Sequence, residues 1–417
     1  MITLIEALNY RCLRYVQRPL KPFHVLVGPN ASGKTTFLDV IGFLGDLVSK
    51  GFDMALSERT SNPEELLFRR QGDKLELAIE ARIPDGLRQL TSKPELDTIR
   101  YEVAIGFNET QHQFAVKAET LLLKKTTVLN LPQRSLFPMP PIVPDSLVSN
   151  PHQRDNKIVM NKGQGGNDNF YSETDSRSGR RPSVRLGPQK SALGNFPVDE
   201  SKFPVAAWFR AYLVTGVQRF VLNSLAIKHP SPPMKFSGFS SDGSNLPWVV
   251  DRVRREDREQ YRAWIAHLRT ALPDLKDITT SVRENDRHCY MIYEYEGGLK
   301  VPSWLVSDGT LRLTALTLPA YLADLQGIYL IEEPENGVHP KAVATAYDSL
   351  SSVYEAQVLL ATHSPVVLSK ASMDDVLCFA KNEDGSTDVV LGSEHPLLQQ
   401  WQGTTDLGTL LAAGVLG

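Results

Sequence analysis

The sequence has few cysteines and no long apolar run. Its three cysteines, Cys12, Cys289 and Cys378, lie far apart and match neither a CxxC pair nor a Cys/His metal motif. Reduced, buried thiols in a cytosolic protein are therefore expected. No window approaches roughly 18 uninterrupted apolar residues, and the opening residues MITLIE lack the basic segment and apolar stretch of a signal peptide. These absences predict a cytoplasmic protein with no membrane partner.

A strong excess of charge is also missing. The chain has 48 acidic and 45 basic residues, a net charge of −3, so any contact with nucleic acid must come from a local patch. Sustained apolar heptads are absent, which excludes a long coiled coil. At 417 residues the chain is long enough for a large core with two or three subdomains.

The most informative stretch of the sequence is residues 25–36. Residues 25–27 are apolar, GPNASGKTT follows, and a helical apolar pattern comes next. Gly28 and Gly33 let successive N–H groups point into one hollow at a helix start, which favours a phosphate-binding P-loop over a glycine-rich turn with no ligand. Lys34 would reach the β- and γ-phosphates, and Thr35 would bind Mg²⁺. The expected nucleotide-binding residues are Gly28, Pro29, Asn30, Ala31, Ser32, Gly33, Lys34, Thr35 and Thr36.

The N-terminal half reads as strands around this loop. We expect strands at 2–7, 13–16 and 23–27, the last buried on both faces, and antiparallel strands with one wet face at 75–83, 99–107 and 113–125. Residues 131–197 are rich in Pro, Ser, Asn, Gly and Arg, which makes regular structure unexpected apart from short strands such as 157–160. The basic end of this stretch is either a solvated linker or a contact for nucleic acid or a partner.

The second half changes from helices to alternating strands and helices. Residues 205–225 and 248–272 have helical apolar spacing, and a hairpin is expected at 289–304. Buried strands are expected at 328–331, 357–360 and 376–380, with helices at 341–354 and 366–370. Such alternation on both sides of an insertion predicts one parallel-sheet domain whose halves lie far apart in the sequence.

Two carboxylates follow the apolar strand 328–331. Ligands of open α/β sheets bind at the carboxyl ends of strands, which places Glu332 and Glu333 near the P-loop. Because side chains alternate along a strand, one acid would serve Mg²⁺ and the other would face a water attacking the γ-phosphate. A solvated strand end is the alternative, since acidic strand ends are common.

Two further segments complete the pattern. His363 follows the strand 357–360 and is placed to bond the γ-phosphate or the attacking water, although a lone histidine there is more often structural. Ser307 is placed as a helix N-cap, with Asp308 in the first turn. This segment is either a plain helix start or an anion site that meets the γ-phosphate bound by another copy.

In this order, the segments resemble the Walker A, signature, Walker B and switch-histidine motifs of ABC-type ATPases. The resemblance is carried by GPNASGKT at 28–35, LVSDGTLRL at 305–313, EEPENGVHP at 332–340 and ATHSP at 361–365. The chain is most similar to the SMC-like and OLD-like branch of bacterial AAA-family ATPases, many of which belong to phage-defence or DNA-repair modules. With LGTL at 407–410, the similarity covers nearly the whole chain.

The resemblance implies an α/β fold: a P-loop NTPase with an ABC-ATPase-like mixed sheet, an antiparallel β subdomain and an inserted helical arm. Residues 1–130 would form the N-terminal half of the ATPase head, with the P-loop and the β subdomain. Residues 131–200 would be a partly flexible insertion and 201–285 the helical arm. Residues 286–417 would form the C-terminal half, with the signature, Walker B and switch-histidine motifs.

The resemblance also implies the roles of the site residues. ATP would lie between two protomers, each P-loop facing Ser307, Asp308 and Gly309 of the other. Glu332 would be the acid linked to Mg²⁺, Glu333 the catalytic base, and Lys34 and His363 the other catalytic residues. For the metal-linked glutamine of the family, Gln189 is the candidate, with Gln71 and Glu119 as rivals.

The chain also departs from the family pattern. It has VSDG where ABC transporters have LSGG, and Glu332 where they have aspartate, so slow, regulated hydrolysis is expected. Only about 35 residues follow the strand 376–380, too few for the C-terminal nuclease domain of OLD-like proteins.

These features predict an ATP-hydrolysing homodimer or higher oligomer that controls a separate effector, a nuclease or toxin, in an anti-phage defence module. The alternative is a DNA-repair ATPase that clamps DNA, which leaves nucleic acid open as a partner. A transporter subunit is less favoured, because LSGG is missing and the insertion is bulky.

Overall fold

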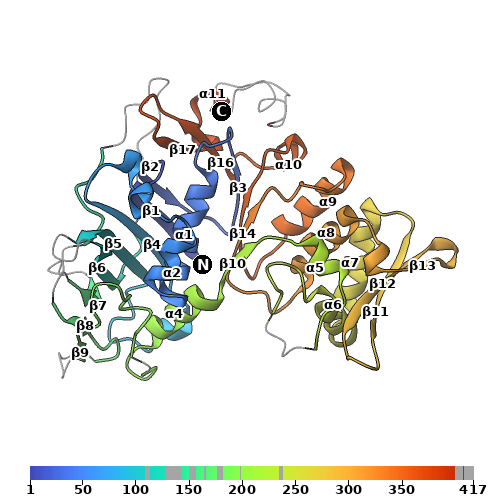
Figure 1. Cartoon of the computed structure of the whole chain (residues 1–417), viewed down its shortest axis with the longest axis horizontal. Coiled ribbons are helices and arrows are strands. Elements are labelled where there is room, and N and C mark those ends of the chain that lie inside the picture. Colours follow the sequence, from blue (N-terminus) through green and yellow to red (C-terminus); the bar gives the residue numbers. More distant parts are fainter. Residues whose placement is uncertain are drawn as a thin grey trace.

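The computed structural model describes residues 1–108, 113–127, 142–149, 156–163, 166–175, 182–197, 199–233, 238–399 and 407. It is an α/β protein built on an eight-stranded sheet, a six-stranded sheet and a three-stranded sheet (Figure 1). Parts of the stretch 131–197, including part of its basic end, and most of LGTL lie outside the described residues. These parts include Pro132, Pro138, Pro140, Pro141, Arg177, Arg180, Arg181 and residues 408–410.

The six-stranded sheet joins the two ends of the chain. Its order is β10 (Val217–Phe220), β14 (Ile328–Glu332), β15 (Gln357–Ala361), β3 (Phe23–Val27), β16 (Val376–Lys381) and β17 (Thr387–Leu391). The first five strands are parallel, and β17 runs antiparallel to β16. The buried strands expected in the last third are thereby confirmed, whereas β17 was not expected.

The eight-stranded sheet is antiparallel throughout. Its order is β2 (Leu13–Pro19), β1 (Ile2–Tyr10), β4 (Lys74–Arg82), β5 (Thr98–Asn108), β6 (Gln113–Lys124), β7 (Lys157–Lys162), β8 (Asp168–Phe170) and β9 (Ser183–Val184). The antiparallel prediction is confirmed, but the expected wet face is covered. Arg100 forms ion pairs with Glu6, Glu80 and Glu102 on that face, and the backbone N–H of Ser149 donates to Glu102. Charged side chains are therefore buried in pairs where alternation alone predicts exposure.

Two hydrophobic cores lie on opposite faces of the six-stranded sheet. The first lies between the two large sheets around α1 (Lys34–Ser49), with α2 (Phe52–Ser57) and α4 (Pro204–Thr215), and it receives Leu26 of β3. The second lies beneath α8 (Asp308–Thr317), α9 (Pro340–Ser351) and α10 (Pro365–Lys370), and it receives Val25 and Val27 of the same strand. Alternate residues of one apolar run thus serve both cores, which is why the run is uninterrupted.

The middle of the chain differs from the helical expectation in two places. The predicted helix over 205–225 is wrong beyond Thr215, because Val217–Phe220 leaves α4 and pairs with β14 as the edge strand β10. The pattern over 248–272 is two helices, α6 (Leu246–Glu256) and α7 (Arg258–Ala271). Asp257 separates them, and its side chain caps α7 by accepting from the backbone N–H of Gln260.

The remaining elements complete the arm and the C-terminal part. Residues 201–285, proposed as the arm, also contain α5 (Ser224–Lys228) and β11 (Leu275–Val282). β11 pairs with β12 (Cys289–Tyr295), which pairs with β13 (Lys300–Pro302), so the hairpin prediction is confirmed. Short helices α3 (Asp85–Arg88) and α11 (Pro396–Gln399) lie elsewhere. All three thiols are free, and burial raises the pKa of Cys289 and of Cys378 to about 12. Among the described helices, none has the length and apolar character needed to cross a membrane.

Candidate nucleotide site

Three neighbouring strand ends bring the predicted segments together. β15 lies between β14 and β3 with all three parallel, so their carboxyl-terminal loops leave the same edge of the sheet. The loop after β3 is the P-loop, the loop after β14 carries Glu333, and the loop after β15 carries His363. This edge is where ligands of parallel sheets bind.

The P-loop glycines are required by close packing as well as by backbone conformation. Gly33 has φ 106°, and a Cβ there would lie 2.3 Å from Oγ1 of Thr387 in β17. A Cβ on Gly28 would lie 2.3 Å from the carbonyl oxygen of Phe379 in β16. Ala31 also adopts a left-handed conformation, with φ 59°. The last two strands of the sheet therefore hold the loop in its curled form.

Lys34 lies over this loop. Its Nζ donates to the carbonyl oxygens of Gly28 at 2.8 Å and of Pro29 at 3.0 Å. Burial lowers the pKa of Lys34, while the negative charges of Glu333 and Glu332 act in the opposite direction. The ammonium group is thus placed at the P-loop within electrostatic range of both acids.

Thr35 and Glu332 meet across the edge of the sheet. The Thr35 hydroxyl, in the first turn of α1, donates to Oε2 of Glu332 at 2.5 Å. Both side chains are exposed, and Glu332 is the last residue of β14. Hydroxyl and carboxylate oxygens are the ligand types that Mg²⁺ binds at nucleotide phosphates.

Glu333 leaves the strand by a left-handed turn. Its φ is 47°, and its N–H donates to the carbonyl oxygen of Ala361 at 2.8 Å. The carboxylate accepts from Nδ2 of Asn336 at 2.5 Å. Glu332 is the last residue of the strand, so the left-handed turn at Glu333, and not the alternation expected along a strand, gives the two acids different directions. A positive φ at a residue other than glycine is uncommon and often marks a functional position.

Glu335 holds the loop that carries His363, a role that sequence reasoning missed. Its Oε1 accepts from the Thr362 hydroxyl at 2.7 Å and from the His363 N–H at 2.9 Å. Its Oε2 is buried and has no hydrogen-bond partner in the described part of the chain. In the sequence Glu335 is merely the third acid in EEPE, and no local pattern distinguishes its role.

The helix start at Ser307 is confirmed as a capped N-terminus. The Ser307 hydroxyl accepts from the Thr310 N–H at 3.3 Å, and Asp308 forms an ion pair with Lys228. A Cβ on Gly309 would lie 2.7 Å from the carbonyl oxygen of Gly337. The helix start therefore packs directly on the turn that follows Glu333.

Arg312 connects this helix to the acid turn. Its Nη1 donates to the carbonyl oxygen of Asn336 at 3.2 Å, and its Nε donates to the Ser224 hydroxyl at 3.1 Å. Since the Asn336 side chain donates to Glu333, continuous contacts run from α8 to that carboxylate. Arg312 was not among the predicted site residues.

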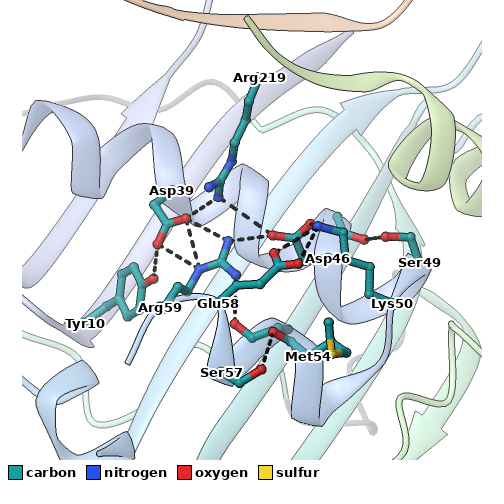
Figure 2. Close-up of polar contacts among 12 residues, drawn as sticks. Tyr10, Asp39, Asp46, Ser49, Lys50, Met54, Ser57, Glu58, Arg59 and Arg219 are labelled. Atoms are coloured by element: carbon teal, nitrogen blue, oxygen red, sulfur yellow. Dashed lines mark hydrogen bonds and ion pairs between the residues drawn. The ribbon is translucent and has the colours of Figure 1, made fainter. Parts of the chain in front are cut away.

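A buried polar network lies behind the P-loop helix (Figure 2). Asp39 of α1 accepts from Arg59 through both oxygens, at 2.7 to 3.0 Å, and from the Tyr10 hydroxyl at 2.5 Å. Arg219 of β10 also pairs with Asp39. Burial alone would raise the pKa of Asp39, but the hydrogen bonds and charge of Arg59 lower it below its ordinary value. The network ties α1 to the end of β1 and to the edge strand.

The three candidates for the metal-linked residue make their contacts away from Thr35 and Glu332. Nε2 of Gln189 donates to Oε1 of Gln113 at 2.9 Å, in the antiparallel sheet, so the structure does not bring Gln189 to Thr35 and Glu332. Its rival Glu119 is fully buried and accepts from the Tyr101 hydroxyl and the Ser191–Leu193 segment. The other rival, Gln71, is exposed, and its carbonyl oxygen accepts from Asn9.

The residues fit a Mg²⁺-bound nucleoside triphosphate. The loop is curled by left-handed residues at a helix N-terminus, where backbone N–H groups favour phosphate oxygens. The buried Ser32 hydroxyl has no hydrogen-bond partner among the described residues, as expected of a loop built around a polar ligand. Lys34 supplies a cation, and Thr35 with Glu332 supplies oxygen ligands.

Comparisons with known proteins agree with this arrangement. Residues 23–119 and 176–369 match the family model described as AAA domain, putative AbiEii toxin, Type IV TA system. The fold is similar to an SMC head bound to the C-winged helix domain of ScpA, with 14% identity over 93% of this chain and 97% of that chain and a TM-score of 0.54. It is also similar to an Smc head domain with an extended coiled coil bound to the C-terminal domain of ScpA derived from Pyrococcus furiosus, with 12% identity, coverage of 93% and 95%, and a TM-score of 0.50.

These similarities to solved structures support the predicted fold. The family match spans more than half of the chain. The chain therefore belongs to this AbiEii-like AAA domain family, and its fold is similar to that of SMC heads.

Proposed function

We propose that the protein binds and hydrolyses ATP with Mg²⁺ and that its nucleotide state controls a partner protein. The observation that carries the proposal is the hydrogen bond between Thr35 and Glu332, whose positions are 297 residues apart in the sequence. It joins the helix that follows the P-loop to the acid at the end of β14. Convergence of these two oxygens beside Lys34 is the arrangement that a nucleotide-bound Mg²⁺ requires.

In this proposal each residue has one task. The P-loop N–H groups and Lys34 bind the phosphates, and Thr35 and Glu332 hold Mg²⁺, which neutralises phosphate charge when bound. Glu333 accepts the proton of the attacking water, with its carboxylate oriented by Asn336. His363 hydrogen-bonds the γ-phosphate or the water.

We further propose that ATP is shared between two copies of the chain, in a homodimer or a higher oligomer. The α8 N-terminus that begins at Ser307 is exposed, and the N–H groups of its first turn other than that of Thr310 suit the γ-phosphate held by the other copy. Large exposed apolar side chains flank it: Leu305 is 71% exposed, and Leu225 of α5, which packs against α8, is 68% exposed. Exposed apolar surface beside such a helix start supports a protein interface there.

The controlled partner in this proposal is a separate effector, a nuclease or toxin, in an anti-phage defence module. The family is described as a putative AbiEii toxin of a Type IV TA system, which supports a role in a toxin–antitoxin module. The similar SMC heads were solved with a separate protein, ScpA, bound to them.

The experiment compares two variants of the purified protein. Glu333→Gln should retain ATP binding, lose phosphate release and accumulate ATP-bound dimers, because only the proton acceptor is removed. Lys34→Ala should lose ATP binding in calorimetry, because the loop then lacks its cation. Wild-type phosphate release by Glu333→Gln would refute the assigned base, and unchanged ATP affinity of Lys34→Ala would refute the nucleotide site itself.

A further inference from the structure

A basic groove lies on the arm, away from the nucleotide-site residues. It has a volume of about 730 Å³ and is formed by the end of α6, one side of α7 and the start of β11. Figure 1 shows these elements at the opposite end of the molecule from the eight-stranded sheet. The cations lining it are Arg254, Arg255, Arg258, Arg262, Arg269 and Lys276. Only two carboxylates line it, so four positive charges are in excess on a chain whose net charge is −3.

Both carboxylates are already engaged by neighbours. Asp251 pairs with Arg255 and accepts from the Thr280 hydroxyl at 2.9 Å. Asp277 accepts from the Tyr261 hydroxyl and from the N–H of Ile278. The acids of the groove are thus committed to structural contacts.

Several of the cations remain uncompensated. Arg258 and Arg262 are exposed and form no ion pair with any residue that the structure describes. Lys276 is also exposed and forms no ion pair there, although its charge helps to lower the pKa of Glu294 on the neighbouring strand. Arg254 stacks on the Tyr261 ring, with its guanidinium carbon 6.0 Å from the ring centroid, a contact that leaves its charge unneutralised. A concave surface that gathers four unpaired cations is costly to maintain, and an anionic partner would relieve the repulsion.

The spacing of the arginines suits a row of phosphates. Arg258, Arg262 and Arg269 lie on one side of α7, and the 11 positions between the first and the last correspond to about 16 Å along the helix axis. One strand of a duplex presents about five phosphates over that length, since they are ~3.4 Å apart along its axis. Because the strand winds once round the duplex in about 10 base pairs, a straight helix faces about two or three of these phosphates at a time.

We infer that this groove binds the phosphate backbone of a nucleic-acid duplex without reading its sequence. Five of the six cations are arginine, whose planar guanidinium binds phosphate through two parallel hydrogen bonds. The aromatic residue of the groove, Tyr261, is buried at 7% exposure and so offers no surface on which an unpaired base could stack. Contacts to phosphates without base contacts position a duplex but carry no sequence information.

The test measures binding of the full-length protein to a labelled duplex DNA of about 30 base pairs, by fluorescence anisotropy at several salt concentrations. Contacts to four phosphates give a slope of log affinity against log salt of about −3.6. Arg258→Gln with Arg262→Gln should weaken binding at least tenfold at low salt and reduce the slope by about 1.8, since each lost contact removes about 0.9. Basal ATP hydrolysis should stay unchanged.

The control is Arg82→Gln with Lys125→Gln, which removes two exposed cations, one at the end of β4 and one just after β6, and should leave binding unchanged. An RNA duplex of equal length distinguishes the two sources of a phosphate backbone, and binding of either duplex supports the inference. Equal affinity of Arg258→Gln/Arg262→Gln and the wild type would overturn it. Displacement of DNA by poly-glutamate at matched charge would also overturn it, and would assign the groove to an acidic protein segment.

Discussion

The contact between Glu335 and the loop that carries His363 allows a test of whether Glu335 positions His363 for hydrolysis. Glu335→Ala removes the oxygen that accepts from both the Thr362 hydroxyl and the His363 N–H. Each hydrogen bond to a charged group contributes about 1.5–3 kcal/mol, so the loop loses about 3–6 kcal/mol of local restraint. Thr362 is fully buried, and its hydroxyl then has to find another partner or move.

The expected consequence is a fall in kcat of about 100-fold, the usual cost of displacing a reacting group by ~1 Å. ATP affinity should change little, because the contacts of the P-loop and Lys34 are untouched. Steady-state phosphate release and calorimetric ATP binding measure the two quantities separately. A thermal melt establishes that the variant is folded.

Glu335→Gln is the matched control. Its amide oxygen can still accept from Thr362 and His363, and its NH₂ takes the place of Oε2, which has no hydrogen-bond partner among the described residues. We expect turnover within a few-fold of the wild type. Wild-type turnover in Glu335→Ala, or an equal loss of ATP binding, would refute the argument that Glu335 acts by positioning His363.

Two further predictions concern the helix start and the polar network. Ser307→Arg should cut hydrolysis without weakening ATP binding by a monomer, because it blocks the proposed shared face; normal turnover would exclude the shared site. Asp39→Ala should destabilise the fold by about 1.5–3 kcal/mol, because the buried Arg59 then keeps only Asp46 as its charged partner, whereas the half-exposed Arg219→Gln should cost less than about 1 kcal/mol. Because folding lowers the pKa of Asp39, its contribution to the free energy of unfolding is complete above the ordinary aspartate pKa and is lost as the pH falls below it. Urea unfolding at a series of pH values measures this loss. Equal unfolding midpoints of Asp39→Ala and Arg219→Gln at neutral pH would refute this account.

Features set by neighbouring residues were predictable from the sequence. The strand 23–27, the glycine-bounded loop and the following helix are encoded within about 25 residues, and Ser307 caps α8 through the N–H of Thr310, three positions away. The antiparallel strands likewise followed from alternation. Their buried charges did not, because Arg100 finds Glu6 across 94 positions of sequence.

Features set by tertiary pairing were not predictable. Val217–Phe220 continues an apolar helical pattern, and only its register against Ile328–Ile331 makes it a strand. The partner of Asp39 in β10, Arg219, lies 180 positions away. Glu335 gains its role only because the turn after β14 meets the end of β15, a contact that no spacing in the chain announces.

The packing of the P-loop against β16 and β17 has a consequence for biosynthesis. β3 emerges from the ribosome early, but both of its neighbours in the sheet, β15 and β16, are translated more than 300 residues later. Phe379 of β16 and Thr387 of β17, which confine Gly28 and Gly33, lie in this same late part of the chain. A nascent chain therefore holds an unfinished phosphate loop until almost all of it has been made, and truncation before β17 would yield a polypeptide that carries the motif without the pocket.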